Sequence, residues 1–290
     1  MPPTSATANR LTDEEVARLK RGALFVREET VRLIAIAKVG HYSSVFSCAE
    51  IFSALYYDVM RLRRGEPAWA DRDRFLMGKG HAAVGLFPLL ADWDFFPKAW
   101  LDDYTRLGSP LGDHPDMRKV PGVDFASGSI GHALSAGSGM ALGGRFLGKD
   151  FSTYVLLGDG EMQEGQVWAA AMGAAHHGLG RLVAIVDRNR VQLDGVVEDV
   201  IRIEPLDEKW ASFGWDVHEV DGHDVEALTL LLRRIRAQGD RGKPVCVIAH
   251  TVKGKGVGFM EREPGWHLGY LAPADEEKAL AEIRANGGVA

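Results

Sequence analysis

The chain has 290 residues, of which 46% are hydrophobic and 26% are charged, a composition typical of a globular protein with one large core. Its 34 basic and 40 acidic residues give a net charge of -6, which provides no positive field for a nucleic acid backbone. No run reaches the roughly 18 apolar residues of a membrane span, and the N-terminus lacks the pattern of a secretory signal. We therefore expect a cytoplasmic protein that binds neither nucleic acid nor a membrane.

The N-terminal part of the chain predicts a loose arm followed by helices. Residues 1–10 carry no apolar period and are expected to form the arm, ahead of a single domain over residues 11–290. Thr12 and Glu15 have the spacing of a capping box, which predicts the start of a long helix. The apolar stretch from Val45 to Met60 predicts a second helix.

Short apolar runs bounded by glycine or polar residues recur through the rest of the chain and predict strands. These runs are 74–77, 153–157, 182–186, 216–220 and 245–249. Segments of helical length lie between them, at 130–147, 163–177 and 225–237, and a last helix is expected over 273–285. The alternation predicts an α/β fold, in which a parallel sheet carries helices on both faces.

Two of the predicted strands end in short polar motifs. One motif is Gly158-Asp159-Gly160, and the other ends in Asn189. Because the carboxyl ends of parallel strands form the ligand crevice, Asp159 and Asn189 can converge on one hard cation. Gly158 and Gly160 permit close approach of the backbone to a bulky anion, and the next helix directs its N-terminus there. The alternative interpretation is an ordinary tight turn at each motif.

The spacing of these motifs carries a family resemblance. Gly160 and Asn189 are separated by 28 residues, 161–188, within the segment GDGEMQEGQVWAAAMGAAHHGLGRLVAIVDRNRVQLDG. This segment resembles the thiamine diphosphate (ThDP) binding signature of transketolases. The resemblance implies that Asp159, Asn189 and the carbonyl group of Val191 bind Mg²⁺ or Ca²⁺. That metal ion would hold the diphosphate of the cofactor.

The resemblance covers about residues 11–270 and includes four histidines. His41 matches a histidine that contacts substrate hydroxyl groups, and His114 matches one near the terminal hydroxyl group of the donor sugar. His81 matches a histidine that reaches the diphosphate, and His267 matches one that touches both diphosphate and substrate. A neutral imidazole donates and accepts hydrogen bonds, which suits sugar hydroxyl groups. The resemblance thus implies catalytic roles for His41, His114 and His267, and cofactor binding by His81 and His267.

Two other segments resemble parts of the cofactor site. Gly128, Ser129 and Ile130 match the family loop that packs against the cofactor, and the resemblance also implies cofactor contacts for Gly158 and Gly160. Glu164 matches a glutamate that lies at the subunit contact and joins a carboxylate relay between two cofactors. A plain acidic residue that stabilises a helix N-terminus is the alternative interpretation of Glu164.

The sequence departs from the family pattern at two places, and in the family the residues after the first histidine border the substrate channel. His132 stands where transketolases usually have Gln, whereas the related deoxyxylulose-phosphate synthases often have His. Tyr42-Ser43-Ser44 replaces the Pro-Gly or Gly-Gly that commonly follows the first histidine. The resemblance therefore does not fix the donor and acceptor sugars.

The chain ends at Ala290, whereas full-length transketolases continue into a pyrimidine-binding domain and a third domain. The resemblance implies that a separate C-terminal-type subunit supplies the pyrimidine site and grips the sugar phosphate. Because the cofactor of the family lies between opposing halves, a heterotetramer of two plus two chains is the simplest assembly.

The resemblance implies a transferase that, with its partner, moves a two-carbon ketol unit from a ketose phosphate to an aldose acceptor. A second hypothesis is a subunit of another ThDP-dependent acyl-transferring or decarboxylating enzyme, such as a deoxyxylulose-phosphate synthase or a pathway-specific ketolase. A third is a non-catalytic, ThDP-sensing subunit. A simple nucleotide-phosphate binder is disfavoured because neither GxGxxG nor GxxxxGK[ST] stands at a strand-to-helix turn.

Overall fold

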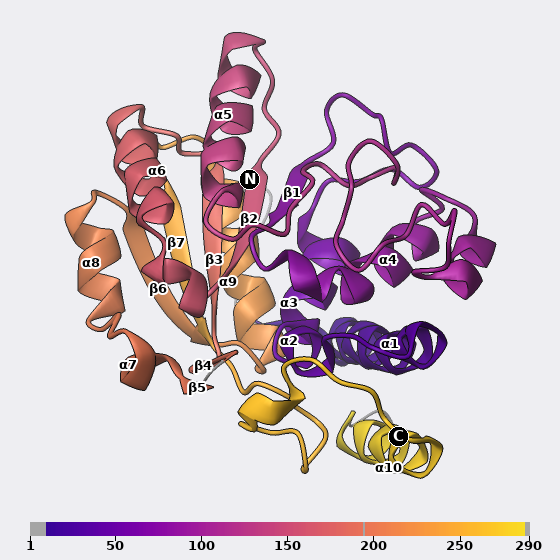
Figure 1. Ribbon diagram of the computed structural model, residues 1–290. Helices are drawn as coiled ribbons and strands as arrows, with labels where there is room; N and C mark the ends of the chain where they lie inside the picture. The colour runs from indigo at the N-terminus through magenta and orange to yellow at the C-terminus, as the bar shows by residue number, and fades with distance from the viewer. Residues whose placement is uncertain (1–9, 194, 288–290) are drawn as a thin grey trace.

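A parallel sheet forms the centre of the molecule (Figure 1). The computed structural model describes residues 10–193 and 195–287. The sheet has five strands in the order β1-β2-β3-β7-β6, and all four pairings are parallel. The strands are β1 Arg74–Met77, β2 Thr153–Gly158, β3 Leu182–Arg188, β6 Asp216–Asp221 and β7 Val245–His250. The predicted α/β fold is confirmed, and each predicted strand lies within the observed one.

Helices cover both faces of this sheet (Figure 1). The α-helices are α1 Asp13–Ala37, α2 Tyr42–Phe46, α3 Ala49–Ala54, α4 Ala83–Asp92, α5 Ala133–Phe146, α6 Gly165–His176, α7 Val197–Val200, α8 Leu206–Ser212, α9 Val225–Gln238 and α10 Pro273–Asn286. Short 3₁₀ turns lie at Gly80–Ala82, Lys98–Asp103, Gly160–Gln163 and Pro264–Trp266, and a π-helical turn lies at Leu55–Val59. A two-stranded hairpin joins β4 Val191–Gln192 to β5 Gly195–Val196.

Successive residues of the central strands point into different layers. Tyr154 and Leu156 belong to the core that α1, α3, α4 and α9 cover, whereas Val155 and Leu157 belong to the core under α5, α6 and α8. All four side chains are fully buried. Burial on both faces explains why β2 has a continuous apolar sequence rather than an alternating one.

The predicted capping box starts α1 as expected. The Glu15 amide donates to Thr12 Oγ1 at 3.2 Å, and the Thr12 amide donates to Glu15 Oε2 at 2.8 Å. Of the predicted loose arm, residues 1–9 lie outside the described residues. α1 ends at Lys38, whose positive φ of 63° turns the chain toward His41 and the site described below.

The prediction of one helix from Val45 to Met60 is wrong. This segment divides into α2, α3 and the π-helical turn. The carbonyl oxygen of Ser44 accepts a hydrogen bond from Lys79 Nζ at 2.8 Å, and the Cys48 amide bonds to Val45 instead. A tertiary contact therefore replaces a helical hydrogen bond, and the helix breaks between α2 and α3.

Three other helices also differ from the prediction. α5 begins at Ala133 rather than at 130, because Gly131 adopts a φ of 88° that is incompatible with a helix. α6 begins at Gly165, after the 3₁₀ turn that follows Asp159. α4 was not predicted, because its residues from Ala83 to Ala91 are buried on every side and give no amphipathic period.

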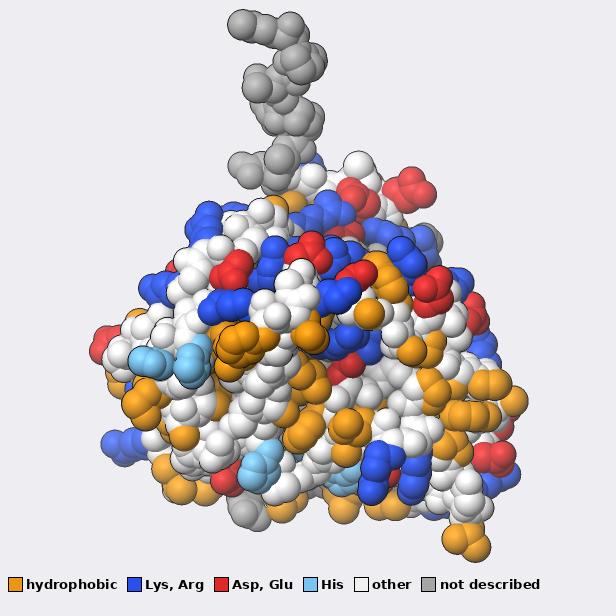
Figure 2. Space-filling view, turned by 90° about the horizontal axis from the view of Figure 1, so that it is seen from above, with side chains coloured by type: hydrophobic (Ala, Val, Ile, Leu, Met, Phe, Trp, Pro, Cys, Tyr) orange, Lys and Arg blue, Asp and Glu red, His pale blue; other side chains and the backbone are white. Residues whose placement is uncertain are grey.

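The surface seen in Figure 2 mixes charge types. Lys and Arg side chains lie among acidic and apolar ones on this face. Ion pairs such as Arg61 with Asp150, at 2.7 Å, and Lys149 with Asp71, at 2.8 Å, balance the basic groups. Within residues 10–193 and 195–287, no helix combines the length and the hydropathy that a membrane crossing requires.

Candidate functional site

A cavity of about 390 Å³ lies at the carboxyl ends of β2 and β3. Segments far apart in the chain line it, and they include most of the predicted site. The lining residues are Ser44, Lys79, His81, Ile130, Gly158, Asp159, Gly160, Glu161, Gln163, Glu164, Asn189, Val191, Gln192, Leu193, Lys253 and His267. A second cavity of about 410 Å³ lies between α1, α9 and α10 and contains none of the predicted site residues.

The predicted metal ligands lie together at the edge of this cavity. Asp159 is 2% exposed, and its Oδ1 accepts from the Gly160 amide at 2.8 Å. Its Oδ2 accepts from the Arg190 amide at 2.5 Å, which links Asp159 to the loop that follows β3. In that loop Asn189 Oδ1 accepts from the Val191 amide at 3.1 Å. The two strand ends therefore meet, as their positions in the sequence predicted.

The donor set fits a hard divalent cation. In the described part of the chain, no three His, Cys, Asp or Glu side chains gather as a metal cluster. The predicted ligands instead combine a carboxylate, a carboxamide and a backbone carbonyl group, and these oxygen atoms suit Mg²⁺ or Ca²⁺. Burial, together with the neighbouring Asp187, raises the pKa of Asp159 above its ordinary value. A bound cation would favour the ionised form of this carboxyl group.

Two buried lysines face the same cavity, and neither was predicted from the sequence. Lys253 is 1% exposed, and its Nζ lies 3.0 Å from the carbonyl oxygen of Val191 and 2.9 Å from His267 Nδ1. Lys79 is 2% exposed and forms an ion pair with Asp187. The signal was present, since both lysines stand within the glycine-rich stretches that contain or precede two of the predicted histidines.

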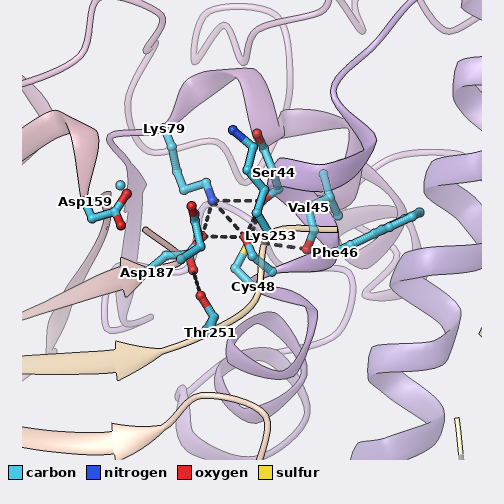
Figure 3. A network of polar contacts seen from close by, with 12 residues as sticks. Ser44, Val45, Phe46, Cys48, Lys79, Asp159, Asp187, Thr251 and Lys253 are labelled. Atoms are coloured by element: carbon cyan, nitrogen blue, oxygen red, sulfur yellow. Dashed lines mark hydrogen bonds and ion pairs between the residues drawn. The ribbon is translucent and has the colours of Figure 1, made fainter. Parts of the chain in front are cut away.

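Asp187 organises a buried network behind the predicted metal ligands (Figure 3). It accepts hydrogen bonds from Ser47 Oγ at 2.6 Å, from Thr251 Oγ1 and from Asn189 Nδ2 at 3.2 Å. Burial alone would raise the pKa of Asp187, but Lys79, Ser47 and Thr251 hold it below its ordinary value. The charged carboxylate thereby fixes the orientation of the Asn189 amide group, whose oxygen is the predicted ligand.

The four predicted histidines form one cluster. The ring centre of His41 lies 5.1 Å from that of His81, 5.3 Å from that of His267 and 6.3 Å from that of His114. His81 and His267 are 5.1 Å apart. The rings come from four separate chain segments, and the fold brings them together. The resemblance had assigned all four to one cofactor and substrate site. Their chemical roles remain predictions.

Two of these rings are held neutral. Burial, followed by the nearby Lys79, lowers the pKa of His81 well below its ordinary value. Burial, followed by Lys253, lowers the pKa of His267 to about 3. Because His267 Nδ1 accepts from the Lys253 ammonium group, Nε2 carries the proton of this ring. His267 can therefore donate a hydrogen bond to an anionic oxygen.

The predicted cofactor loop is only partly in the cavity. Ile130 lines it, whereas Gly128 and Ser129 are exposed and do not. Gly128 supports His114 instead, since a Cβ atom placed on it would lie 3.3 Å from that ring. Glu164 lies at the cavity edge and against Gly131.

Glu161 connects the loops around the cavity. Its carboxylate accepts from the Gly131 amide at 2.7 Å and from the Gly158 amide at 3.1 Å. It also fills the space beside Gly78, where a Cβ atom would lie 2.3 Å from its oxygens. Burial raises the pKa of Glu161 to about 7. This residue was missed because a lone glutamate one position after Gly160 has no distinctive pattern.

The two departures from the family pattern occupy different places. His132 is exposed and does not line the cavity. Ser44 lines it, and Ser43 Oγ donates to the carbonyl oxygen of Trp266 at 2.8 Å, next to His267. The Tyr42-Ser43-Ser44 segment therefore joins the His41 and His267 segments to each other.

The fold and the cavity define an α/β protein with a candidate ligand site at the carboxyl edge of a parallel sheet. The sequence profile of the family described as "Transketolase, thiamine diphosphate binding domain" matches residues 20–286. The chain belongs to the transketolase family and corresponds to its ThDP-binding domain. The resemblance that the sequence motifs carried is thereby confirmed.

Two subunit-length relatives resemble the chain over most of its length. An apulose-4-phosphate transketolase subunit of Phocaeicola vulgatus is 39% identical over 257 residues, which cover 89% of this chain and 90% of that protein. The 6-deoxy-6-sulfo-D-fructose transketolase subunit SqwG of a Clostridium species is 36% identical over 274 residues, which cover 94% of this chain and 99% of that protein.

Solved transketolases have the same fold over a fraction of their length. The transketolase of Leishmania mexicana superposes with a TM-score of 0.85 at 27% identity, over 93% of this chain and 41% of that one. The transketolase of Pichia stipitis in complex with sedoheptulose-7-phosphate gives a TM-score of 0.83 at 28% identity, over 93% of this chain and 43% of that one. The chain thus spans less than half the length of these enzymes.

Proposed function

We propose that this chain is the ThDP-binding subunit of a two-chain transketolase, which transfers a two-carbon ketol unit from a ketose phosphate to an aldose acceptor. The observation that carries the proposal is the cavity in which Asp159, Asn189 and the Val191 carbonyl group adjoin the histidine cluster. The family supports ThDP as the cofactor. The names of the two subunit-length relatives support a partner chain, and the apulose-4-phosphate transketolase subunit supports a sugar phosphate substrate.

Each part of the cavity has a task in this proposal. Asp159, Asn189 and the Val191 carbonyl group would hold Mg²⁺ or Ca²⁺, and the metal ion would hold the diphosphate. Lys79, Lys253 and the donating face of His267 surround the same space and favour an anion there. When bound, ThDP would supply the nucleophilic carbon that cleaves the C2–C3 bond of the ketose.

The histidines would recognise the substrate. His41 and His114 lie at one side of the cluster, with His81 and His267 closer to the metal ligands that line the cavity. Neutral imidazole rings bind hydroxyl groups by accepting and donating hydrogen bonds, and this suits the hydroxyl-bearing carbons of a ketose. His41, His114 and His267 are therefore the proposed catalytic residues of this chain.

The partner would cover the open side of the cavity. Three large apolar side chains near the cavity are exposed: Leu193 by 59%, Ile201 by 58% and Leu268 by 49%. Leu193 lines the cavity, Ile201 accepts a hydrogen bond from the lining residue Gln163, and Leu268 follows His267. Exposed apolar groups around a functional cavity are typical of an interaction surface. We assign this surface to a C-terminal-type subunit in a two-plus-two assembly.

Reconstitution tests the proposed reaction. The chain is co-expressed with a candidate C-terminal-type subunit, and the complex is supplied with ThDP, Mg²⁺ and either a ketose phosphate with an aldose or pyruvate. Ketol transfer supports the proposal. Turnover of pyruvate alone would favour the decarboxylating or synthase alternative, whereas metal-dependent ThDP binding without any turnover would favour a sensing subunit.

Substitution tests the cofactor site separately. Asp159→Ala and Asn189→Ala should each abolish the Mg²⁺-dependent binding of ThDP in calorimetry, because each removes one of only three predicted oxygen ligands. Asp207→Ala, on the exposed side of α8, serves as the control. Binding of ThDP by either site variant with the affinity of the unmodified chain would remove the metal assignment.

A further inference from the structure

One carboxylate lies between the two outer histidines of the cluster. Asp113 Oδ1 is 3.6 Å from His41 Nδ1, and Asp113 Oδ2 is 3.4 Å from His114 Nδ1. The Tyr104 hydroxyl group approaches Oδ1 at 3.5 Å. Three donor groups from separate positions therefore converge on Asp113, which does not line the main cavity.

His41 depends on this carboxylate. The residue is only 9% exposed, and in the described structure its buried Nδ1 has no partner at hydrogen-bond distance. Asp113 is the carboxylate that approaches this nitrogen. Polar groups in substrate sites often lie slightly too far apart without ligand and approach each other when the substrate binds. A shift of a few tenths of an ångström would make this contact a hydrogen bond.

His114 has its ring confined between Asp113 and the loop at Gly128. A Cβ atom at Gly128 would lie 3.3 Å from His114 Cδ2, so the glycine backbone lies close against one side of the ring. Partial burial raises the pKa of Asp113, but His41, His114 and Tyr104 together hold it below its ordinary value. The carboxylate is charged at neutral pH and can accept from both rings.

We infer that Asp113 is a positioning residue that directs His41 and His114 together, by accepting a hydrogen bond from the Nδ1–H group of each ring. In a neutral imidazole, a proton on Nδ1 leaves the lone pair on Nε2. Both rings then present an acceptor to the substrate, in contrast to His267, whose Nδ1 accepts from Lys253. The inference rests on the proposed function, because it assigns the acceptors to hydroxyl groups of the donor ketose.

The distribution of acceptors and donors has a consequence for substrate choice. Two accepting rings on one side of the cluster suit the proton-donating hydroxyl groups of a sugar, and a donating ring suits an anionic oxygen. A carboxylate among them disfavours a second phosphate or other anion near His114. The end of the substrate that approaches His41 and His114 should therefore carry neutral hydroxyl groups.

The tautomers can be measured on this chain without any turnover. In chains labelled with ¹⁵N-histidine, the ring nitrogen shifts of His41 and His114 should report protonation at Nδ1. The Asp113→Ala variant should move both rings toward the Nε2–H form, and Asp113→Asn, which keeps one acceptor oxygen, should restore part of the change. Asp116→Ala is the matched control, since Asp116 pairs with Arg118 and touches neither ring.

Unchanged ring shifts of both histidines in folded Asp113→Ala would overturn the inference, as would an equal effect of Asp116→Ala. The His267 signals should stay constant and show that the cluster has not unfolded. Should Asp113→Ala fail to fold, Asp113→Asn carries the test, because it should shift both rings by a smaller amount.

The reconstituted holoenzyme gives a second readout. Asp113→Ala should raise the KM for the ketose donor by about tenfold, the effect of roughly one lost hydrogen bond, and leave ThDP affinity unchanged. An unchanged KM would contradict the assignment of the acceptors to the donor ketose. If the unmodified complex has no ketol transfer at all, the proposed function fails, whereas the tautomer measurement still decides the role of Asp113.

Discussion

Lys253 Nζ donates a hydrogen bond to the carbonyl oxygen of Val191 at 3.0 Å. That oxygen is the third predicted ligand of the proposed divalent cation, so the ammonium group and such a cation would compete for the same atom. Burial lowers the pKa of Lys253 to about 8, which keeps the group mostly charged at pH 7. A diphosphate, in contrast, attracts both the ammonium group and the metal ion.

This competition predicts opposite effects of one substitution. Lys253→Met should strengthen the binding of Mn²⁺ alone, followed by electron paramagnetic resonance, because a repelling charge and a competing donor are removed. The same variant should weaken the binding of ThDP at saturating Mg²⁺ by about tenfold or more, the cost of one charge-assisted hydrogen bond. Calorimetry measures the second affinity.

Lys255→Met is the control for Lys253→Met. Lys255 is two residues away and its Nζ is 3.7 Å from Glu261, outside the site cavity. Lys255→Met should leave the affinities for Mn²⁺ and for ThDP unchanged. A Lys253→Met chain in which the two affinities change in the same direction would contradict the competition for the Val191 oxygen.

The sequence predicted that Asp159 and Asn189 converge but did not predict the two lysines beside them, for a physical reason. Asp159 and Asn189 follow apolar strands, and the carboxyl ends of parallel strands must meet at one edge. Lys79 and Lys253 are found inside the molecule only because Asp187 and the Val191 carbonyl group accept from them. A buried lysine needs a tertiary partner, and no local period of the sequence reports that partner.

In the fold, too, local sequence signals were predictable and tertiary contacts were not. The strands and the long helices α1 and α9 were predictable, because apolar runs and the capping box at Thr12 are local signals. The break between α2 and α3 was not, because Lys79 causes it from another segment. The gathering of His41, His81, His114 and His267 depended on the family resemblance, since only the folded chain brings these segments together.

Asp187 should contribute strongly to stability. Asp187→Asn replaces a fully buried carboxylate and leaves the Lys79 ammonium group without its charge partner. Removal of one member of a buried ion pair costs about 3–5 kcal/mol. The urea unfolding midpoint at pH 7 should fall accordingly.

The matched control for Asp187 is an exposed ion pair. Asp150→Asn breaks the 2.7 Å contact with Arg61, but the Asp150 side chain is 64% exposed. Such pairs contribute only about 0–1 kcal/mol. Equal losses of unfolding free energy in the two variants would show that the buried Lys79–Asp187 pair contributes no more to stability than the exposed Arg61–Asp150 pair.

A second buried pair predicts sensitivity to acid. Glu50 accepts from Arg27 at 2.6 and 2.8 Å and contacts His223 Nδ1 at 2.9 Å. Burial alone would raise the pKa of Glu50, but Arg27 and His223 lower it from 4.5 to about 2. A carboxyl group with a lower pKa in the folded state stabilises the fold fully above pH 4.5, and this contribution is lost as the pH falls toward 2.

The comparison with Glu50→Gln isolates this contribution. At about pH 6 the unmodified chain should have the larger free energy of unfolding, and the difference should shrink steadily between pH 4.5 and 2. Chemical unfolding of both chains at several pH values measures this difference in unfolding free energy. A difference that is independent of pH over this window would mean that the Glu50 charge adds nothing beyond its hydrogen bonds.

The exposed apolar residues beside the cavity predict where the partner binds. Leu193 and Ile201 are 59% and 58% exposed, and Leu193 lines the cavity. Leu193→Asp or Ile201→Asp places a charge where we propose that the two chains exclude water, and should weaken association by at least about tenfold. The side chains are already exposed in this chain, so its own unfolding temperature should not change. Sedimentation of the mixed subunits measures the association.

Phe146→Asp is the matched control for the interface prediction. Phe146 is 83% exposed, but it is the last residue of α5, and the neighbouring Arg145 bonds to the carbonyl oxygens of His177 and Gly178, which precede β3 at the amino edge of the sheet. Phe146→Asp should leave both the association of the subunits and the affinity for ThDP unchanged. If Phe146→Asp separates the subunits and Leu193→Asp does not, the partner binds at the amino edge of the sheet. In that case it cannot cover the cavity, and residues of this chain alone would have to complete the site.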